Sequence, residues 1–573
     1  MAQTLIDRLN DHAARHPSDI AITFLTTGDA ASEDLTYAQL REAALGLSGA
    51  LQAHGLQGRR VLLCFPSGLP FVTALLACMY AGAVPVPVAP PRARDDSGFR
   101  RIERIARDCS AIAILCTDQI FDAHRFRIDP AGDARWLSVA DLGGGASAPA
   151  AVSVDDIAFL QYTSGSTAEP RGVIVTHANL ASNIAATTEF MGIDAATVFV
   201  SWLPLHHDMG LIGMLLQAVY GGNRLVLMSP QHFLQRPRRW LEAMDRFGGH
   251  LSGAPNFAYD LCVKRVAPET RAALDLSRWR VAFNGAEPVR ASTLAAFGDA
   301  FAVAGFSRGA FFPCYGLAET TLYAAGGFAS KSAHVIRFDS SELSAGRARA
   351  AEAAAGVDLA GCGAAPSAHA IIIADPATRK PMAPGEVGEI LITGPSVARG
   401  YWGAAAATKD TFQVRVPGDD RDFLATGDLG FLWQAELFVT GRLKDTLLLR
   451  GRNIYPQDIE LTAETCDPSA PINGCVAFAD DVGGEERLVV IKEVRHEHSP
   501  TLASLGQQIA RRVLEEHEIQ PFRVVLTRLG AIPRTSSGKV RRRASRETLA
   551  AGLLPILVDH RAAVPRLHPA GQS

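Results

Sequence analysis

The sequence has little net charge and no closely spaced cysteine pair. Its 573 residues include 56 basic and 59 acidic side chains, so the formal charge of −3 gives no global field that favours nucleic acid or an anionic bilayer. The nine cysteines are an odd number without a Cys-x-x-Cys pair, which argues against a disulfide framework and indicates buried thiols in a reducing compartment. We therefore expect a cytoplasmic protein that acts on small molecules.

An export signal and an uninterrupted membrane span are also missing. The first nine residues include an acidic side chain, Asp7, where a signal peptide would be basic and then apolar. The most apolar window, residues 69–89, is long enough to span a bilayer, but Pro70, Pro85 and Pro87 interrupt it. We expect a buried helix over residues 71–80 and a strand over residues 84–88 instead, and no stable insertion into a membrane.

The chain lacks a Walker loop, but residues 161–172 form a different phosphate-binding pattern. This stretch, Gln-Tyr-Thr-Ser-Gly-Ser-Thr-Ala-Glu-Pro-Arg-Gly, lies between strand-like residues 157–160 and 173–175, whereas a Walker loop opens a helix. Its glycines let the backbone approach an anion, and its hydroxyls and amides can donate to phosphate. The alternative is an ordinary polar hairpin turn, and motifs further along the chain decide between the two.

Five motifs follow this loop in order. They are residues 284–288 (Asn-Gly-Ala-Glu-Pro), 315–320 (Tyr-Gly-Leu-Ala-Glu-Thr), 426–428 (Thr-Gly-Asp), 441–445 (Gly-Arg-Leu-Lys-Asp) and 533–539 (Pro-Arg-Thr-Ser-Ser-Gly-Lys). With them the chain resembles, from about Leu5 to about Leu557, the adenylate-forming superfamily of acyl-CoA synthetases, luciferases and peptide-synthetase adenylation domains. Residues 202–213 (Trp-Leu-Pro-Leu-His-His-Asp-Met-Gly-Leu-Ile-Gly) and 252–259 (Ser-Gly-Ala-Pro-Asn-Phe-Ala-Tyr) are most similar to the fatty acyl-AMP ligases within it.

The fold class follows from periodicity and the domain division from the resemblance. Short apolar runs alternate with helix-length amphipathic stretches over residues 61–116 and 159–227, which predicts stacked α/β layers. The resemblance implies a large, multi-lobed N-terminal domain over residues 1–441 and a small, mobile α+β domain over residues 442–564, with Lys444 at the hinge. Residues 565–573 are expected to form a disordered tail.

The resemblance also implies an ATP site. Ala168 and Arg171 depart from the glycine and lysine that are common in the superfamily loop, but Arg171 keeps the charge. Thr-Gly-Asp on its own is more often a simple turn. The implied nucleotide-binding residues are Thr163, Ser164, Gly165, Ser166 and Thr167 around the phosphates, Gly285, Ala286 and Glu287 along the adenine, Tyr315 stacked on the base, Gly316 and Thr320 beside it, and Asp428 and Arg442 on the ribose.

Three side chains are candidates for catalysis. A carboxylate that approaches the α-phosphate of ATP needs cations between the two anions, and Lys539 carries a compact charge on a long stem in a Gly-Lys turn. The resemblance identifies it as the adenylation lysine, and the alternative is an exposed turn lysine. Glu319 is the implied Mg²⁺ ligand, since hard cations bind oxygen, and the alternative is an N-cap or surface residue. His207 is the implied carboxylate-steering residue, with a satisfied core histidine as the alternative.

The sequence around His207 raises two further questions. Residues 206–208 (His-His-Asp) suggest a metal site, but neighbours on an extended chain point to opposite faces and cannot converge without a turn. The apolar stretch that follows can line an alkyl tunnel or form plain core. The candidate acyl-binding residues are Met209, Gly210, Ile212, Gly213 and Met214.

Two segments bear on the acyl acceptor. Residues 330–360 form a long connection without a motif and contain an alanine-rich, helix-prone run, residues 345–355. Fatty acyl-AMP ligases carry an insertion in this region that is thought to restrain the small domain; the alternative is a surface loop. The basic run at residues 541–543 is either a solvated helix start or a docking point for an acidic carrier protein.

The sequence thus predicts an enzyme that uses ATP and Mg²⁺ to convert a fatty acid to acyl-AMP and then transfers the acyl group to the phosphopantetheine of an acyl carrier protein. No Asp-Ser-Leu attachment motif occurs, so the carrier is expected on a separate chain. One alternative is an acyl-CoA ligase of the same fold. Another is a non-catalytic acyl or nucleotide sensor, against which the presence of Lys539, Glu319 and Asp428 argues.

Overall fold

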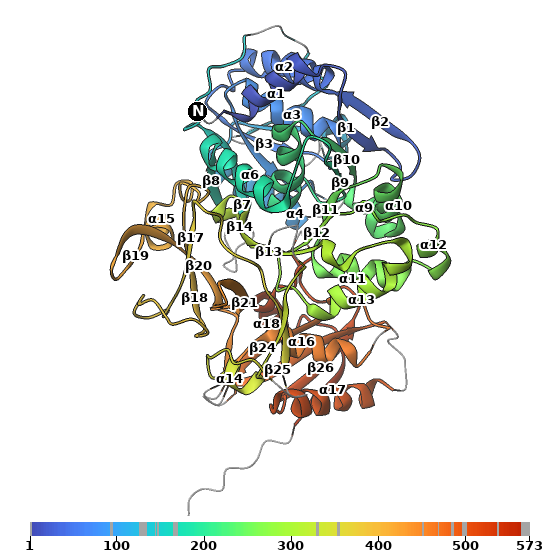
Figure 1. Cartoon of the computed structure of the whole chain (residues 1–573), viewed down its shortest axis with the longest axis vertical. Helices are drawn as coiled ribbons and strands as arrows, with labels where there is room; N and C mark the ends of the chain where they lie inside the picture. Colours follow the sequence, from blue (N-terminus) through green and yellow to red (C-terminus); the bar gives the residue numbers. More distant parts are fainter. Residues whose placement is uncertain are drawn as a thin grey trace, which may run out of the picture.

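The chain folds into a large N-terminal domain and a small C-terminal domain, which Figure 1 shows in orange and red at the bottom of the molecule. This computed structural model describes residues 3–91, 96–124, 134–143, 145, 148–163, 170–327, 332–351, 356–449, 452–467, 469–482, 486–495, 501–535 and 538–562. The tail predicted over residues 565–573 lies outside these ranges.

An eight-stranded sheet forms the centre of the large domain, with strand order β14-β13-β12-β11-β9-β10-β1-β2. Its inner pairs are parallel, whereas β13–β14 and β1–β2 are antiparallel and close the two edges. Helices cover the inner strands, which therefore read as continuous apolar runs. The strands are β1 Ile20–Leu25, β2 Ser32–Thr36, β9 Val198–Ser201, β10 Arg224–Met228, β11 Leu251–Gly253, β12 Val281–Asn284, β13 Phe311–Gly316 and β14 Tyr323–Gly326.

A second, parallel sheet has the order β4-β3-β5-β6 and confirms the interpretation of the apolar window. Helix α3 (Leu69–Tyr80) is buried and leads to strand β4 (Val84–Val88), as the prolines predicted. The other strands are β3 Arg60–Cys64, β5 Ala113–Cys116 and β6 Arg135–Ser138. The strands predicted on either side of the phosphate loop are β7 (Ile157–Thr163) and β8 (Arg171–Thr176), which pair as an antiparallel hairpin.

The helices of the large domain begin where the sequence supplies caps. Thr4, Thr36 and Thr176 each accept a hydrogen bond from a backbone N–H of the first turn, which satisfies a donor that has no partner inside the helix. The helices are α1 Leu5–Arg15, α2 Tyr37–Ala53, α4 Asp96–Asp108, α5 Asp118–His124, α6 His177–Met191, α7 Asp208–Gly210, α8 Gln217–Gly221, α9 Pro230–Gln235, α10 Arg238–Arg246, α11 Asn256–Arg265, α12 Pro268–Ala272, α13 Ala291–Phe301 and α15 Ala405–Phe412, with a π-helix η1 at Leu211–Leu216 and short 3₁₀ turns η2 Ala302–Ala304, η3 Arg308–Ala310 and η4 Ala318–Thr320.

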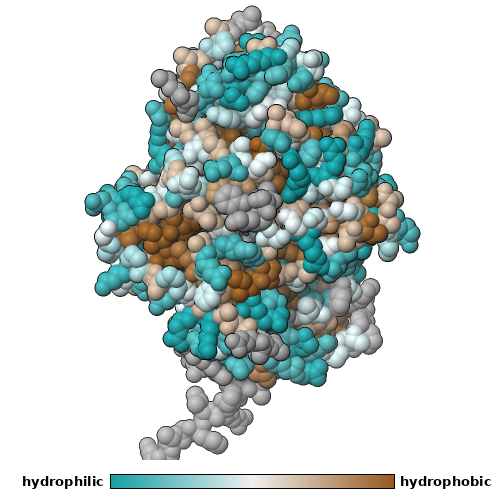
Figure 2. Space-filling view, viewed as in Figure 1, coloured by the Kyte–Doolittle hydropathy of each residue, from teal (hydrophilic) through white to brown (hydrophobic). Residues whose placement is uncertain are grey.

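A third, antiparallel sheet lies on the left of Figure 1, where Figure 2 shows apolar residues gathered at the surface. It consists of β17 Ala370–Ala374, β18 Gly388–Thr393, β19 Val414–Val416, β20 Asp419–Trp433 and β21 Glu436–Arg442. The hairpin of β15 (Val335–Phe338) and β16 (Val357–Ala360) packs against it: the buried Phe338 ring contacts Phe431, Trp433 and Phe438. The segment predicted as an insertion is therefore anchored on the large domain.

The prediction of a helix over residues 345–355 is wrong for residues 345–351, the part of this run that the structure describes. Helix α14 (Ser340–Ser344) lies just before that run, because Asp339 accepts hydrogen bonds from Ser341 N (2.8 Å) and Glu342 N (3.0 Å) at its start. Gly346 then takes φ +83°, a left-handed conformation that ends the helix. Beyond it the backbone is extended, since Ala350 forms a bridge with Phe338, and residues 352–355 lie outside the described ranges.

The C-terminal domain has its own sheet and core. Strands β24 Cys475–Asp481, β25 Glu486–Val494, β26 Arg523–Arg528 and β27 Ile556–Arg561 pair in sequence order, next to the small hairpin β22 Leu447–Leu449 and β23 Arg452–Ile454 and helices α16 Pro456–Thr465, α17 Leu502–His517 and α18 Arg542–Ala550. Ile459, Val490 and Leu526 are fully buried in this core. The predicted fold class, a large α/β domain followed by a small α+β domain, is confirmed.

Two sequence expectations concern the molecule as a whole. All nine cysteines are free thiols, and most of them are buried. Within the ranges given above, we find no helix that combines the length and the apolar character needed to cross a bilayer.

Candidate active site

The two domains enclose one cavity of ≈ 2200 Å³ that contains most of the predicted site. The large domain contributes residues from β13, the loop after β12 and the turn before α7, and the C-terminal domain contributes α16 and the turn before α18. The predicted residues that line the cavity are Thr163, His207, Met209, Gly213, Ala286, Glu287, Tyr315, Gly316, Glu319, Asp428, Arg442, Lys444 and Lys539.

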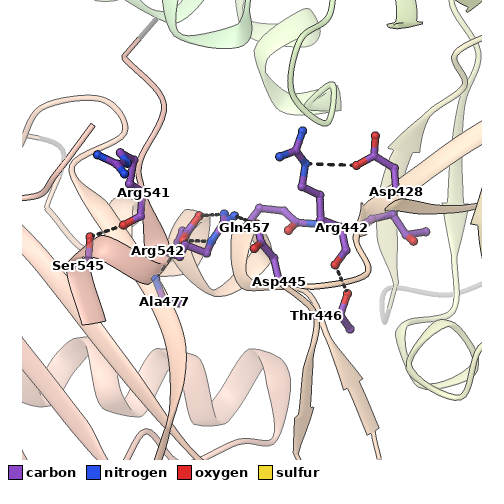
Figure 3. Close-up of polar contacts among 11 residues, drawn as sticks. Asp428, Arg442, Asp445, Thr446, Gln457, Ala477, Arg541, Arg542 and Ser545 are labelled. Carbon is purple, nitrogen blue, oxygen red and sulfur yellow. Dashed lines mark hydrogen bonds and ion pairs between the residues drawn. The ribbon is translucent and has the colours of Figure 1, made fainter. Parts of the chain in front are cut away.

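Tyr315, Asp428 and Arg442 form a connected polar group in one wall. The Tyr315 hydroxyl donates to Asp428 Oδ2 at 2.7 Å. Arg442 Nε lies 3.2 Å from Asp428 Oδ1, a contact that Figure 3 shows. Burial raises the pKa of Asp428, and the nearby Arg442 cation acts in the opposite direction. The carboxylate is held by neighbours on both sides, which fixes its orientation toward the cavity.

The loop after β12 presents backbone and acidic groups to the cavity. Ala286 adopts φ +69°, and a Cβ at Gly285 would lie 3.0 Å from the Cys314 carbonyl oxygen, so this loop depends on small residues. Asn256 supports it: its Nδ2 donates to Glu287 Oε1 (3.0 Å) and to the Pro288 carbonyl (2.9 Å). Glu287 is therefore held in place by a buried amide.

His207 is neutral and faces the charged groups of the cavity. Burial lowers its pKa to about 4, with Asp208 acting to raise it and Lys539 to lower it further. Its ring lies 4.6 Å from the ring of His206, whose pKa burial also lowers. Among the residues in the described ranges, no three His, Cys, Asp or Glu side chains gather into a metal-binding group.

Lys539 reaches this cavity from the C-terminal domain. It lies in a tight turn in which Thr535 N donates to the Lys539 carbonyl (2.8 Å) and Gly538 takes φ +86°. The side chain is exposed to the cavity, yet surrounding protein atoms and Arg442 lower its pKa, while Asp208, Glu287 and Asp428 act to raise it. One mobile cation thus faces several acidic groups of the other domain.

Glu319 lies near a second carboxylate, Asp208. Burial raises the pKa of Glu319, and the negative charge of Asp208 contributes in the same direction. Tyr401 opposes this shift, since its hydroxyl donates to Glu319 Oε1 at 2.8 Å. Two neighbouring carboxylates repel each other, and a divalent cation between them would relieve the repulsion. Their oxygen atoms fit Mg²⁺, which binds one or two carboxylates together with water and phosphate oxygens.

The rest of the predicted phosphate site is only partly described. Thr163 ends β7 and Arg171 starts β8, and both line the cavity. Ser164, Gly165, Ser166 and Thr167 lie outside the described ranges. The Thr320 hydroxyl bonds within its own turn, to the Leu317 carbonyl at 2.9 Å, so its side chain supports the turn after β13.

The candidate acyl-binding residues divide into two groups. Met209 and Gly213 line the cavity, and a Cβ at Gly213 would lie 2.9 Å from Leu322 Cδ2, so glycine keeps this wall open. Within the described chain Gly210, Ile212 and Met214 do not line it. Ile212 and Met214 belong to the buried core, and a Cβ at Gly210 would lie 2.3 Å from the Pro204 carbonyl oxygen. These three residues therefore belong to the hydrophobic core, which is the alternative that the sequence left open.

Figure 3 shows Arg541 and Arg542 of the basic run together with Asp445, the residue that follows the predicted hinge Lys444. Arg542 Nη2 is 2.7 Å from Glu460 Oε2 and its Nη1 is 2.9 Å from Asp445 Oδ2, so this arginine ties α18 to α16 and to the connection between the domains. Lys444 is exposed in the turn between β21 and β22. Its role as a hinge stays a prediction.

Sequence reasoning missed several residues of the site. Tyr401 contacts Glu319, Asn256 supports the loop after β12, and Leu322 faces Gly213. The sequence pointed to Asp208 only as part of the His-His-Asp motif, and not as a neighbour of Glu319. A weak signal for Tyr401 existed, because an aromatic residue directly after Gly400 interrupts a loop of small and polar residues. The other contacts depend on long-range packing.

Comparisons with known proteins show which family the chain resembles. Residues 9–402 match the AMP-binding enzyme family, and residues 444–556 match the Disco-interacting protein 2-like AMP domain. The medium-chain-fatty-acid–[acyl-carrier-protein] ligase JamA of Moorena producens is 38% identical over 96% of each chain. A structure from studies of fatty acyl-adenylate ligases from E. coli and L. pneumophila has 35% identity and a TM-score of 0.88, covering 96% of this chain and 98% of that one. A fatty acyl-adenylate ligase from L. pneumophila in complex with acyl adenylate and pyrophosphate has 37% identity and a TM-score of 0.75, covering 97% and 98%.

Proposed function

The chain belongs to the AMP-binding enzymes and, among them, to the fatty acyl-AMP ligases, and we propose that it activates a fatty acid with ATP and passes the acyl group to the phosphopantetheine thiol of a separate carrier protein. The observation that carries the proposal is the position of Lys539. This cation of the C-terminal domain faces His207, Asp208, Glu287 and Asp428 of the large domain inside one cavity.

The arrangement suits the first half-reaction. A fatty carboxylate and the α-phosphate of ATP are both anionic, so the barrier to their approach is largely electrostatic. Lys539 would bridge the two anions, while the neutral His207 would donate a hydrogen bond to the carboxylate without adding charge. Tyr315 would lie against the adenine, and Asp428 with Arg442 would bind the ribose hydroxyls.

Mg²⁺ is the cofactor that the acidic pair would hold. Glu319 and Asp208 would bind it, and when bound it would neutralise phosphate charge and orient the departing pyrophosphate. Tyr401 would keep the Glu319 carboxylate turned toward the metal. Thr163 and Arg171, with Ser164, Gly165, Ser166 and Thr167, would bind the β- and γ-phosphates.

The fatty acyl chain would enter the apolar side of the cavity. Met209, Gly213 and Leu322 lie there together with Phe283 and Tyr323. Because Gly213 leaves space that a side chain would fill, we infer that the alkyl chain passes this wall. Gly210, Ile212 and Met214 would shape the wall from behind.

Carrier protein as acceptor is favoured over coenzyme A by the segment between β15 and β16. Helix α14 lies against β23 of the C-terminal domain, while Phe338 anchors the hairpin on the large domain. A segment that holds both domains would favour one domain orientation, and a bias of about 2 to 3 kcal/mol leaves the competing orientation at a few per cent or less.

The test is to incubate purified protein with ATP, Mg²⁺ and fatty acids of increasing length, and to measure acyl-AMP and pyrophosphate. Coenzyme A and a holo-carrier protein are then supplied separately as acceptors. We expect acyl-AMP with the parent protein and acyl-carrier product in excess of acyl-CoA. Efficient acyl-CoA formation would establish the acyl-CoA ligase alternative instead, and failure to release pyrophosphate with any acid would exclude the proposed activation.

A further inference from the structure

Arg290 makes an ion pair across the two domains. It directly precedes helix α13 of the large domain, and its Nη1 lies 3.6 Å from Glu464 Oε2 near the end of helix α16 in the C-terminal domain. Both side chains are largely buried, with 18% and 14% of their surface exposed. An ion pair in such a site is screened less by salt than one at the open surface. Burial raises the pKa of Glu464 to about 7, while Arg290 and Lys492 act to lower it, so the pair is fully charged above that pH.

The backbone of Arg290 is fixed on two sides. Its N–H donates to Asn256 Oδ1 at 3.0 Å, and the same Asn256 holds Glu287 in the loop after β12. Arg290 also forms an isolated β-bridge with Leu359 of strand β16. The side chain therefore extends from a rigid base that is shared by the nucleotide loop and the β15–β16 hairpin.

The charges around Arg290 come from both domains. Glu464, Glu460 and Asp458 face it from α16, and Glu287 and Asp260 face it from the large domain. Glu460 is already bound by Arg542 at 2.7 and 2.8 Å, and Asp260 and Glu287 belong to the same domain as Arg290. Of the acidic side chains of α16, Glu464 forms the ion pair with Arg290, at 3.6 Å, and their attraction draws α16 toward the large domain.

Helix α16 and the turn that carries Lys539 belong to one packed unit. Ile459 and Ala463 of α16 lie in the same core as Val490 of β25. The Lys539 turn is tied to β25 by Arg534, whose Nη2 lies 2.7 Å from Glu493 Oε2. The position of α16 against the large domain therefore determines how far Lys539 reaches into the cavity.

We propose that Arg290 is a positioning residue for acyl-AMP formation: its ion pair with Glu464 holds the C-terminal domain in the orientation that brings Lys539 to the reacting groups. This inference rests on the proposed function. It concerns the first half-reaction alone, because the domain must leave this orientation for the thiol acceptor to reach the acyl-AMP. Loss of the ion pair should therefore slow acyl-AMP formation without slowing acyl transfer.

The experiment compares Arg290→Gln, Glu464→Gln, the double variant and Arg290→Lys with the parent protein. Both half-reactions are measured at pH 8, where Glu464 is charged: pyrophosphate release in a single turnover measures adenylation, and supplied acyl-AMP with holo-carrier protein measures transfer. Each glutamine variant should slow adenylation about tenfold and leave transfer unchanged or faster. The double variant should be no slower than either single one, and Arg290→Lys should recover most of the rate.

Arg280→Gln is the matched control, because Arg280 pairs with Asp194 at 3.5 Å within the large domain and both side chains are about half exposed. It should leave both half-reactions unchanged. Equal slowing of adenylation and transfer in Arg290→Gln, additive losses in the double variant, or no loss at all would overturn the inference. If Arg290→Gln does not fold, the rates of adenylation and transfer in Glu464→Gln test the inference by themselves. A parent protein that forms no acyl-AMP would instead reject the proposed function.

Discussion

The hydroxyl of Tyr401 donates a hydrogen bond of 2.8 Å to Glu319 Oε1. The two residues come from different parts of the large domain, since Glu319 lies in the short turn η4 after β13 and Tyr401 lies before α15. The guanidinium of Arg171 lies 5.2 Å from the centre of the Tyr401 ring. The residue that would hold the metal is thus coupled through one tyrosine to the basic end of the phosphate loop.

Tyr401→Phe should weaken Mg²⁺ binding while it preserves the ring that Arg171 contacts. A hydrogen bond to a charged group contributes about 1.5–3 kcal/mol, so the Mg²⁺ concentration for half-maximal pyrophosphate release should rise about tenfold or more. Tyr220→Phe is the control, because its hydroxyl bonds the Gln3 carbonyl far from the cavity. An unchanged Mg²⁺ titration would show that Tyr401 does not orient Glu319 for the metal.

Lys539→Ala should abolish acyl-AMP formation and leave the fold intact, because the exposed side chain fills no core volume. Loss of one strong transition-state contact costs about 3–4 kcal/mol, on the order of a few hundredfold in rate. The measurement is pyrophosphate release, with thermal unfolding to check the fold. Parental rates of acyl-AMP formation in this variant would exclude Lys539 from the first half-reaction.

Lys444→Pro tests the hinge. Proline fixes φ, while the hydrogen bonds donated by Leu443 N to Gly427 and by Thr446 N to Arg442 do not involve the backbone N–H that is lost. We expect adenylation to continue and transfer to slow by about tenfold or more, because the C-terminal domain must rotate between the two steps. Lys444→Ala should behave as the parent does. A proline variant in which both steps slow equally would count against a hinge at this position.

The segment between β15 and β16 can be removed without breaking the hairpin. Phe338 and Val357 are direct partners in the antiparallel register, so an Asn-Gly turn in place of residues 339–356 should keep β15 and β16 paired. Phe338 would stay against Phe431 and Phe438, whereas α14 and its contact with β23 would be lost.

This replacement should raise acyl-CoA output about tenfold, because a restraint of about 2 kcal/mol on the domain orientation is released. Acyl-AMP formation serves as the internal control and should change little. If the replacement leaves the ratio of acyl-CoA to acyl-carrier product as it was, the segment does not select the acceptor.

The sequence predicted those parts of the fold that depend on neighbouring residues in the chain. The apolar runs on either side of the glycine- and serine-rich loop form β7 and β8. Pro70 lies in the first turn of α3, and Pro85 and Pro87 lie in β4, so the apolar window is divided as the prolines predicted. The prediction of a helix in the alanine-rich run was wrong because helix propensity is a weak effect. The Asp339 cap and the positive φ of Gly346 place the helix before the run instead.

The site could be predicted only as far as motifs reach. Lys539, Glu319, Asp428 and His207 carry recognisable patterns, and they line one cavity. Tyr401 and Glu319 are 82 positions apart, and neither periodicity nor spacing relates them. Arg290 and Glu464 lie in different domains, so their contact depends on how the domains pack, which no local pattern records.

The last prediction concerns pH and the buried face of α16. Burial raises the pKa of Asp458 to about 7, with Glu460 acting in the same direction and Arg290 in the opposite one. The pKa in the folded protein therefore exceeds that of the unfolded chain, so protonation favours the folded state. This contribution is fully present below about pH 4 and is lost as the pH rises to about 7.

Asp458→Asn substitutes a neutral side chain of the same shape and removes this titration. Relative to the variant, the parent should lose about 1–2 kcal/mol of stability between pH 5 and pH 8, less than the full linkage value because Asp458 is partly open to the cavity. Thermal unfolding of both proteins at four pH values measures the difference, and the titration of Glu464, which both share, largely cancels. A stability difference that stays constant with pH would show that Asp458 is ionised at pH 5 in the folded protein, contrary to the raised pKa.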